Sequence, residues 1–206
     1  MLVWSFFTGL KLEIEGAHNI SKDKTYVFIA NHTNLLDVLL VGSALQHPYK
    51  PLAKYELWDL PLIGKMIDLV SVPVNRSDAE SRLRSFHQMV HTLKRGISIL
   101  VFPEGTRNLS NNPLLPFKNG AFRMAIDAQV PIVPISLLNV RSLHFKGTLL
   151  VKPGTITLKY LSPIPTEGLT PENLSQLRRQ VYQAMQADIL ANDPWFQSLH
   201  RPKLSF

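Results

Sequence analysis

The sequence has no cysteine in its 206 residues. This absence excludes disulfide bonds, thiolate metal sites, iron–sulfur clusters and a cysteine acyl-enzyme, so the chemistry must use oxygen and nitrogen groups. Asn-x-Ser/Thr sequons, among them those at Asn19, Asn31, Asn108 and Asn173, would be glycosylation acceptors in a eukaryotic secretory lumen. Together with the lack of cysteine, they favour a cytoplasmic location.

The sequence also lacks an apolar run of the roughly 18 residues that a membrane-spanning helix requires. Residues 1–10, MLVWSFFTGL, are nevertheless almost wholly apolar and have no basic residue ahead of them, which argues against a signal peptide. Because tryptophan and phenylalanine favour the headgroup region, we expect an interfacial segment here. The alternative, that these residues pack on the core, stays equally open.

Acidic residues are scarce in the middle of the chain. Between Ser81 and Thr166 there are eleven lysines and arginines against Glu104 and Asp127, a charge of +9 where the whole chain carries +7. This charge indicates an anionic partner, whether a phosphate-bearing substrate, an acidic carrier protein, an anionic lipid surface or nucleic acid. No nucleic acid is expected, because these charges are not interleaved with aromatic residues at a stacking surface.

Strand and helix patterns alternate along the chain, with 45% apolar and 18% charged residues overall. Strand patterns cover residues 11–15, 26–30, 70–74, 97–102, 130–138 and 155–161. Helix patterns cover residues 35–45, 77–95, 120–128 and a segment opened by Thr170 and Pro171. The sequence therefore predicts a single-domain α/β fold over residues 11–192, a layered sheet flanked by helices, and a C-terminal tail over 193–206.

A histidine and an aspartate follow the buried strand at 26–30, in the segment NHTNLLD (31–37). If His32 lies on the turn before the helix, it can meet Asp37 and face a cleft with its second nitrogen, which is the arrangement of a general base with a carboxylate partner. Taken alone, such a pair is more often a satisfied core contact.

The buried strand at 97–102 ends in a second polar turn, FPEGTR (102–107). Arg107 can bind a phosphate with two hydrogen bonds, and Gly105 lets backbone N–H groups approach an anion. Glu104 would repel a phosphate, so we expect it to orient Arg107 or to accept a substrate hydroxyl. A surface turn with an internal ion pair is the alternative.

Together these segments resemble the glycerolipid acyltransferase family, whose best-known member acylates 1-acylglycerol-3-phosphate to phosphatidic acid. The resemblance extends from Leu12 to Leu161. It rests on four blocks: NHTNLLD; KYEL (54–57) with VNR (74–76); FPEGTR with FKNGA (117–121); and VPIVPI (130–135). It implies that His32 and Asp37 are catalytic. It also implies a set of substrate-binding residues: Lys54, Arg76, Glu104, Gly105, Thr106, Arg107 and Lys118.

Two features depart from the family pattern. Asn34 stands where many relatives have serine, close to the expected base. Relatives also usually carry a longer membrane-embedded helical pair before the first strand, whereas here the mostly apolar segment 1–10 precedes it. We therefore expect shallower insertion, as a peripheral protein on the cytoplasmic face of a membrane.

The mechanism expected from the resemblance is direct acyl transfer. His32 takes the proton of a free hydroxyl on a lysophospholipid acceptor, and the alkoxide attacks the thioester of acyl-CoA or acyl carrier protein. Backbone N–H groups near the helix start or at Gly105 would stabilise the oxyanion. There is neither cysteine nor a GxSxG elbow, which disfavours an acyl-enzyme, and no cofactor or metal is needed.

Other functions stay open on the sequence. The alternative acceptors are glycerol-3-phosphate and another lysophospholipid. The alternative functions are a thioesterase and a non-enzymatic protein that binds anionic membranes. The His–Asp pair argues against a non-enzymatic protein. The cations expected to bind an acceptor phosphate, Lys54, Arg76 and Arg107, argue against a thioesterase. His87 and His91 share a helix face, but Gln88 stands where a zinc protease has glutamate, and no third ligand is evident.

Overall fold

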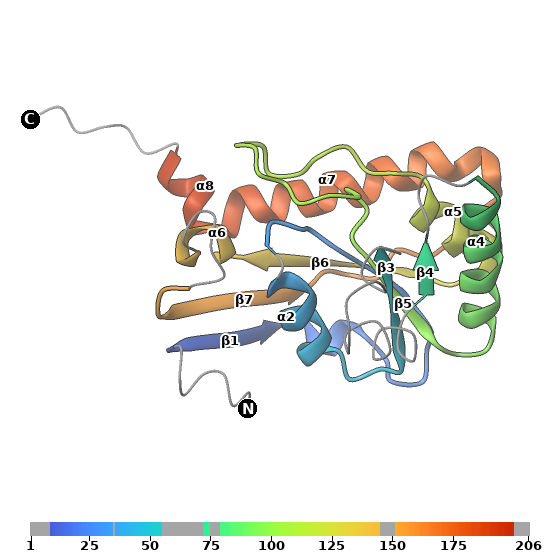
Figure 1. Cartoon of the computed structure of the whole chain (residues 1–206), viewed down its shortest axis with the longest axis horizontal. Helices are drawn as coiled ribbons and strands as arrows, with labels where there is room; N and C mark the ends of the chain where they lie inside the picture. Colours follow the sequence, from blue (N-terminus) through green and yellow to red (C-terminus); the bar gives the residue numbers. More distant parts are fainter. Residues whose placement is uncertain (1–8, 35, 55–71, 75–78, 145–150, 200–206) are drawn as a thin grey trace, which may run out of the picture.

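The computed structural model describes residues 9–34, 36–54, 72–74, 79–144 and 151–199. Strands and helices follow one another along most of this chain (Figure 1). The strands are β1 (Leu10–Glu15), β2 (Val27–Ala30), β3 (Tyr49–Lys54), β4 (Val72–Val74), β5 (Ser98–Val101), β6 (Ile132–Leu138) and β7 (Gly154–Tyr160). The helices are η1 (Ala17–Asn19), α2 (Leu36–Ala44), α4 (Ala79–Lys94), α5 (Gly120–Ala128), α6 (Val140–Leu143), η3 (Pro171–Asn173), α7 (Leu174–Asn192) and α8 (Pro194–Leu199). The predicted α/β fold is confirmed.

The described strands form one seven-stranded sheet in the order β1-β7-β6-β2-β5-β3-β4. Strands β6 and β7 are antiparallel, and every other neighbouring pair of described strands is parallel. Because β2, β5 and β3 run in the same direction, the segments that follow them leave the sheet at one edge. That edge carries residues 31–37, residues 102–107 and Lys54, the last residue of β3.

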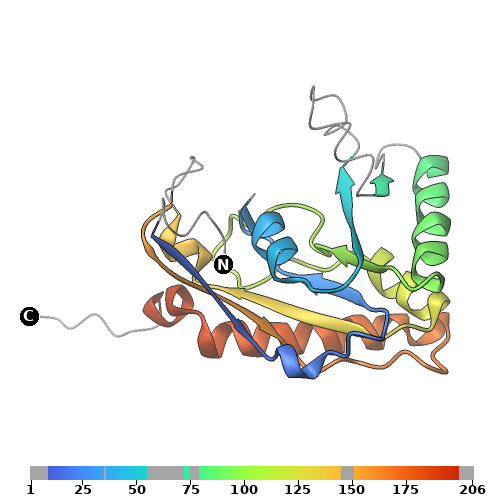
Figure 2. The same cartoon turned by 90° about the horizontal axis from the view of Figure 1, so that it is seen from below.

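The central strand β2 is buried on both faces. Val27 and Ile29 belong to the core layer beneath α4, α5 and α7, whereas Phe28 and Ala30 belong to the layer beneath α2. Figure 2 shows α7 along one face of the sheet and α2 on the other. Alternate side chains of a strand point to opposite faces, so one apolar run serves both layers. Burying a side chain such as Phe28 contributes about 1.5–3 kcal/mol.

Helix α4 ends as predicted, but its buried stripe differs from the prediction. Gly96 has φ +85° and donates its N–H to the Leu93 carbonyl at 3.0 Å, which closes the helix. Leu93 is buried, but Leu83, predicted to lie on the same stripe, is 56% exposed, and Met89 is buried instead. The later turns of α4 therefore supply the core contacts. The predicted capping box starts at Ser77, outside the described residues.

The sequence did not predict η1, β3, α6 or α8; of these, β3 and α8 are the longest. Strand β3 contains Pro51 and no apolar run, yet it pairs with both β4 and β5 through its backbone. Helix α8 lies in the segment expected to be a tail. Its first turn is capped by Asp193, whose Oδ1 accepts the Trp195 N–H at 2.9 Å, and Phe196 is buried. The expected tail therefore contains a helix that packs on the core.

Candidate active site

His32 lies in the turn between β2 and α2, and its predicted contact with Asp37 is present. The Nδ1 atom of His32 is 3.0 Å from Asp37 Oδ2. Its ring packs against Phe102 with 4.5 Å between the ring centroids, and its side chain is 16% exposed. Among the described residues Nε2 has no hydrogen-bond partner. With Nδ1–H donating to the carboxylate, Nε2 carries the lone pair of a general base.

The turn that precedes α2 fixes Asp37 in place. Oδ2 of this buried side chain also accepts the N–H groups of Thr33 at 2.6 Å and Asn34 at 2.7 Å. Asn34 in turn caps the helix, since its Oδ1 accepts the Leu36 N–H at 2.9 Å. Asn34 therefore has a defined role in starting α2. Oδ2 of Asp37 is thus bonded to His32, Thr33 and Asn34, and these three contacts hold the carboxylate against the imidazole.

Glu104 binds backbone amides rather than Arg107. Its Oε1 accepts the N–H of His32 at 2.9 Å, and its Oε2 accepts the N–H of Leu115 at 2.8 Å. The side chain is 3% exposed. Burial raises the pKa of Glu104, while these two hydrogen bonds and the charges of His32 and Arg141 oppose that rise. The two roles expected for Glu104, orienting Arg107 and accepting a substrate hydroxyl, are not supported by this geometry.

The segment after FPEGTR binds the other side of His32. The N–H of Asn108 donates to the His32 carbonyl at 2.6 Å, and the N–H of Lys118 donates to the Pro103 carbonyl at 2.8 Å. His32 is thus held at its N–H by Glu104 and at its carbonyl by Asn108. The NHTNLLD and FPEGTR segments, 72 residues apart at the His32–Glu104 bond, form one unit.

The expected acceptor-binding residues are distributed around this unit. Three of them are exposed, as expected of residues that bind the phosphate group of a substrate: Thr106, Arg107 and Lys118. Lys54 ends β3, and the pairing of β3 with β5 places its backbone at the same sheet edge as the FPEGTR turn. Arg76 lies outside the described residues. The structure thus brings these described positions to the edge that carries His32.

Among the described residues, the amides expected to bind the oxyanion already donate to internal acceptors. The N–H groups of Thr33 and Asn34 donate to Asp37, and that of Leu36 donates to Asn34. Gly105, with φ +76°, donates its N–H to the Phe102 carbonyl at 3.1 Å. A donor committed to an internal acceptor cannot also bind a developing oxyanion without breaking that bond. The prediction that these amides stabilise the oxyanion is therefore not supported.

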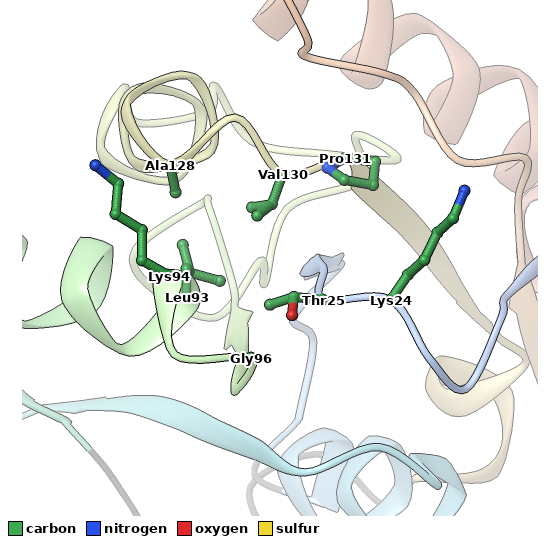
Figure 3. A pocket seen from close by; sticks show the side chains of 8 residues that line it. All are labelled: Lys24, Thr25, Leu93, Lys94, Gly96, Ala128, Val130 and Pro131. Atoms are coloured by element: carbon green, nitrogen blue, oxygen red, sulfur yellow. The ribbon is translucent and has the colours of Figure 1, made fainter.

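The structure also contains a cavity of about 440 Å³, shown in Figure 3. Its lining includes Thr25, Gly96 and Pro131, which precede β2, β5 and β6 respectively. It therefore opens at the amino ends of the strands, at the sheet edge opposite the one that carries His32. Among the described residues, no group of three or more His, Asp or Glu side chains could hold a metal ion, and His87 and His91 are exposed.

The fold and the site define an α/β enzyme with a His–Asp pair at the carboxyl ends of parallel strands in a mixed sheet. The chain belongs to the Acyltransferase family, whose model matches residues 11–138. The match includes both the NHTNLLD and the FPEGTR segments. It ends before α6, α7 and α8.

Several named relatives and a solved structure are among the proteins similar to the chain. The human 1-acyl-sn-glycerol-3-phosphate acyltransferase alpha is 35% identical over 182 residues, which is 87% of this chain and 64% of that protein. The human beta enzyme is 31% identical over 91% of this chain and 68% of that protein. The crystal structure of the 1-acyl-sn-glycerophosphate acyltransferase PlsC from Thermotoga maritima matches with a TM-score of 0.75 and 27% identity, over 96% of this chain and 75% of that one.

Proposed function

We propose that this chain transfers a fatty acyl group from acyl-CoA or acyl carrier protein to the free hydroxyl of 1-acylglycerol-3-phosphate. The product is phosphatidic acid, an intermediate of phospholipid biosynthesis. The observation that carries the proposal is the His32–Asp37 contact at the sheet edge that also holds Arg107. The names of the relatives support the same acceptor.

The proposed reaction is one acyl transfer with no covalent enzyme intermediate. His32 Nε2 accepts the proton of the acceptor hydroxyl, and the oxygen forms a bond to the thioester carbonyl carbon. The carbon–sulfur bond then breaks, and the leaving thiolate takes the proton back from His32. Asp37, 3.0 Å from Nδ1, stabilises the imidazolium between these two steps.

Acceptor binding is assigned to exposed cations at this edge. The Arg107 guanidinium can grip a phosphate with two parallel hydrogen bonds, and Lys54, Arg76 and Lys118 remain predicted contributors. Glu104 contributes indirectly, because its carboxylate accepts the backbone N–H of His32 and so helps to fix that residue. A thioesterase would need no such cations, because its acceptor is water.

We also propose that the protein binds the cytoplasmic face of a membrane peripherally, where a lysolipid acceptor resides. No described helix is long and apolar enough to cross a bilayer. Leu39 of α2 is 60% exposed, and Leu109, next to the residue that binds the His32 carbonyl, is 78% exposed. Both lie on segments that leave the sheet near His32, so docking through them would bring the site to the lipid surface.

The reaction is tested with purified protein, labelled acyl donor and a panel of acceptors. The panel contains 1-acylglycerol-3-phosphate, glycerol-3-phosphate, other lysophospholipids and a sample without acceptor. We expect transfer to 1-acylglycerol-3-phosphate to exceed hydrolysis, and His32→Ala to lower it by at least about 10²-fold. His18→Ala, at an exposed histidine of η1, is the control. Full turnover in folded His32→Ala protein, or acceptor-independent thioester cleavage alone, would refute the proposal.

Membrane binding is tested by vesicle co-sedimentation. Deleting residues 1–9 should release the protein from anionic vesicles at moderate salt. Salt should weaken binding of the full chain more on anionic than on neutral vesicles, because the Debye length is about 10 Å at 0.1 M. Leu109→Ser should weaken binding to both. If the truncated protein stays bound in high salt, another surface does the docking, and if neither form binds, a soluble acceptor is favoured.

A further inference from the structure

Arg141, in the short helix α6, links the active-site loop to the C-terminal helix. Its guanidinium donates from Nη1 to the Ser110 carbonyl and from Nη2 to the Asn112 carbonyl, the latter at 3.5 Å. The same group lies over two aromatic rings of α8, 4.9 Å from the centroid of Trp195 and 5.4 Å from that of Phe196. Arg141 and α8 both lie outside the region matched by the family model.

Asn108 binds the same two residues from within the loop. Its buried side chain accepts the N–H of Ser110 at 3.1 Å and the Ser110 hydroxyl at 2.7 Å, and it donates to the Asn112 carbonyl at 3.0 Å. Its backbone N–H donates to the His32 carbonyl at 2.6 Å. Ser110 and Asn112, which Arg141 binds, are therefore hydrogen-bonded directly to Asn108, and Asn108 in turn binds the His32 carbonyl.

The far end of the loop reaches His32 by a second route. Leu115 donates its N–H to Glu104, and the other oxygen of Glu104 accepts the N–H of His32. Both backbone polar groups of His32 thus depend on the conformation of residues 104–115. A loop shift would move the imidazole relative to the acceptor hydroxyl, and a displacement of about 1 Å can lower a rate about 10²-fold.

The support beneath Arg141 is fixed by Asp193. This carboxylate is 3% exposed, and it accepts the N–H of Asn139 at 3.0 Å and the N–H of Trp195 at 2.9 Å. It therefore ties the start of α6 to the start of α8. Burial lowers the pKa of Arg141, and the charges of Asp193, Glu104 and Asp37 oppose that shift. The cation thus lies between the C-terminal helix and the carboxylates of the site.

We propose that Arg141 is a positioning residue, held on the aromatic side chains of α8, that fixes the 108–115 loop and through it His32. Its effect on turnover rests on the proposed function, whereas its effect on loop order does not. Helix α8 thereby takes part in the reaction through Arg141 and the loop, without contacting the substrate.

Arg141→Met removes the charge and both donors while keeping a long side chain. We expect kcat to fall about tenfold or more, with the KM values for acceptor and donor within about twofold of wild type. Backbone hydrogen exchange over residues 104–115 should accelerate, whereas the exchange rates of the sheet should stay unchanged. Arg141→Lys, which retains charge but not the two-pronged geometry, should give a partial loss. Arg179→Met, at an exposed position of α7, is the matched control.

Substitution of Trp195 tests the same contact between Arg141 and α8 if Arg141→Met does not fold. Trp195→Leu should reproduce the fall in kcat and the faster loop exchange, whereas Trp195→Phe, which keeps an aromatic face, should stay close to wild type. The effects of Arg141→Met and Trp195→Leu should be strongly non-additive, because both act on one link.

Three outcomes would overturn the proposal. Unchanged loop exchange and turnover in folded Arg141→Met would show that the link is dispensable. A raised acceptor KM with normal kcat and normal exchange would make Arg141 a phosphate ligand instead. Additive effects of the two substitutions would separate Arg141 from α8. If wild type shows no acyl transfer at all, the proposed function fails, while loop exchange still tests the link.

Discussion

Replacing Asp37 by asparagine separates the charge of this residue from its shape. The amide oxygen can take the position of Oδ2 and still accept the N–H groups of Thr33 and Asn34. The amide nitrogen then occupies the position of Oδ1, which has no hydrogen-bond partner among the described residues. The local geometry should therefore survive, and the imidazolium formed in the reaction should lose its counter-charge.

The cost follows from the distance between the two groups. Unit charges 3.0 Å apart attract by about 5–6 kcal/mol at an effective dielectric constant of about 20. The neutral amide keeps a hydrogen bond with His32 of about 1 kcal/mol, and the 16% exposure of His32 adds some solvent screening. About 3–4 kcal/mol of transition-state stabilisation remains at stake, which corresponds to a fall in kcat of about 10²- to 10³-fold.

The assay is kcat at saturating acceptor and donor, together with thermal unfolding to confirm the fold. Asp23→Asn, at an exposed aspartate, controls for the loss of one negative charge. The loss should appear mainly in kcat, because the imidazolium exists only after proton transfer. A folded Asp37→Asn protein within about threefold of wild type, or one changed only in acceptor KM, would refute the reasoning.

Three further predictions address the acceptor, Glu104 and the core. Arg107→Lys should raise the acceptor KM far more than the donor KM, because lysine cannot bind a phosphate with two parallel hydrogen bonds. Arg95→Lys, at an exposed position, is the control. If Arg107→Lys lowers thioester hydrolysis as much as it lowers acyl transfer, Arg107 has a structural role instead. Because burial raises the folded-state pKa of Glu104 above the ordinary 4.5, its contribution to stability is present below pH 4.5 and is lost as pH rises through the folded pKa. The free energy of unfolding of wild type relative to Glu104→Gln should therefore fall above pH 4.5 in urea titrations, and a pH-independent difference would contradict this. Asn31→Ala leaves the buried N–H and carbonyl of Leu137 without the side chain that binds them at 2.7 and 3.0 Å, so the free energy of unfolding should drop by about 1–3 kcal/mol; an unchanged urea midpoint would argue against this contact.

Local pattern was enough to predict most elements and the central contact. The apolar runs predicted β2 and β5, and the glycine at 96 predicted the end of α4. His32 and Asp37 are five residues apart across a strand-to-helix turn, so their contact depends on local backbone geometry. Strand β3 escaped prediction because its pairing uses backbone groups, and its side chains carry no periodic signal.

The role of Glu104 was decided by tertiary structure. A carboxylate beside an arginine in sequence predicted a local ion pair, but its partners are the amides of His32, 72 residues away, and Leu115. Any residue except proline can supply a backbone N–H, so no residue type in the sequence marks these donors.

The same physical reason applies to Arg141 and the C-terminal helix. The sequence by itself determined the alternating fold, the His–Asp pair and the basic character of the middle segment, because these depend on periodicity, short spacing and composition. Only the tertiary structure placed Arg141 between the Ser110 carbonyl and the Trp195 ring, 54 residues further along the chain. Carbonyl acceptors and aromatic faces leave no local signature of their partners, so the folded sheet alone decides which of them meet.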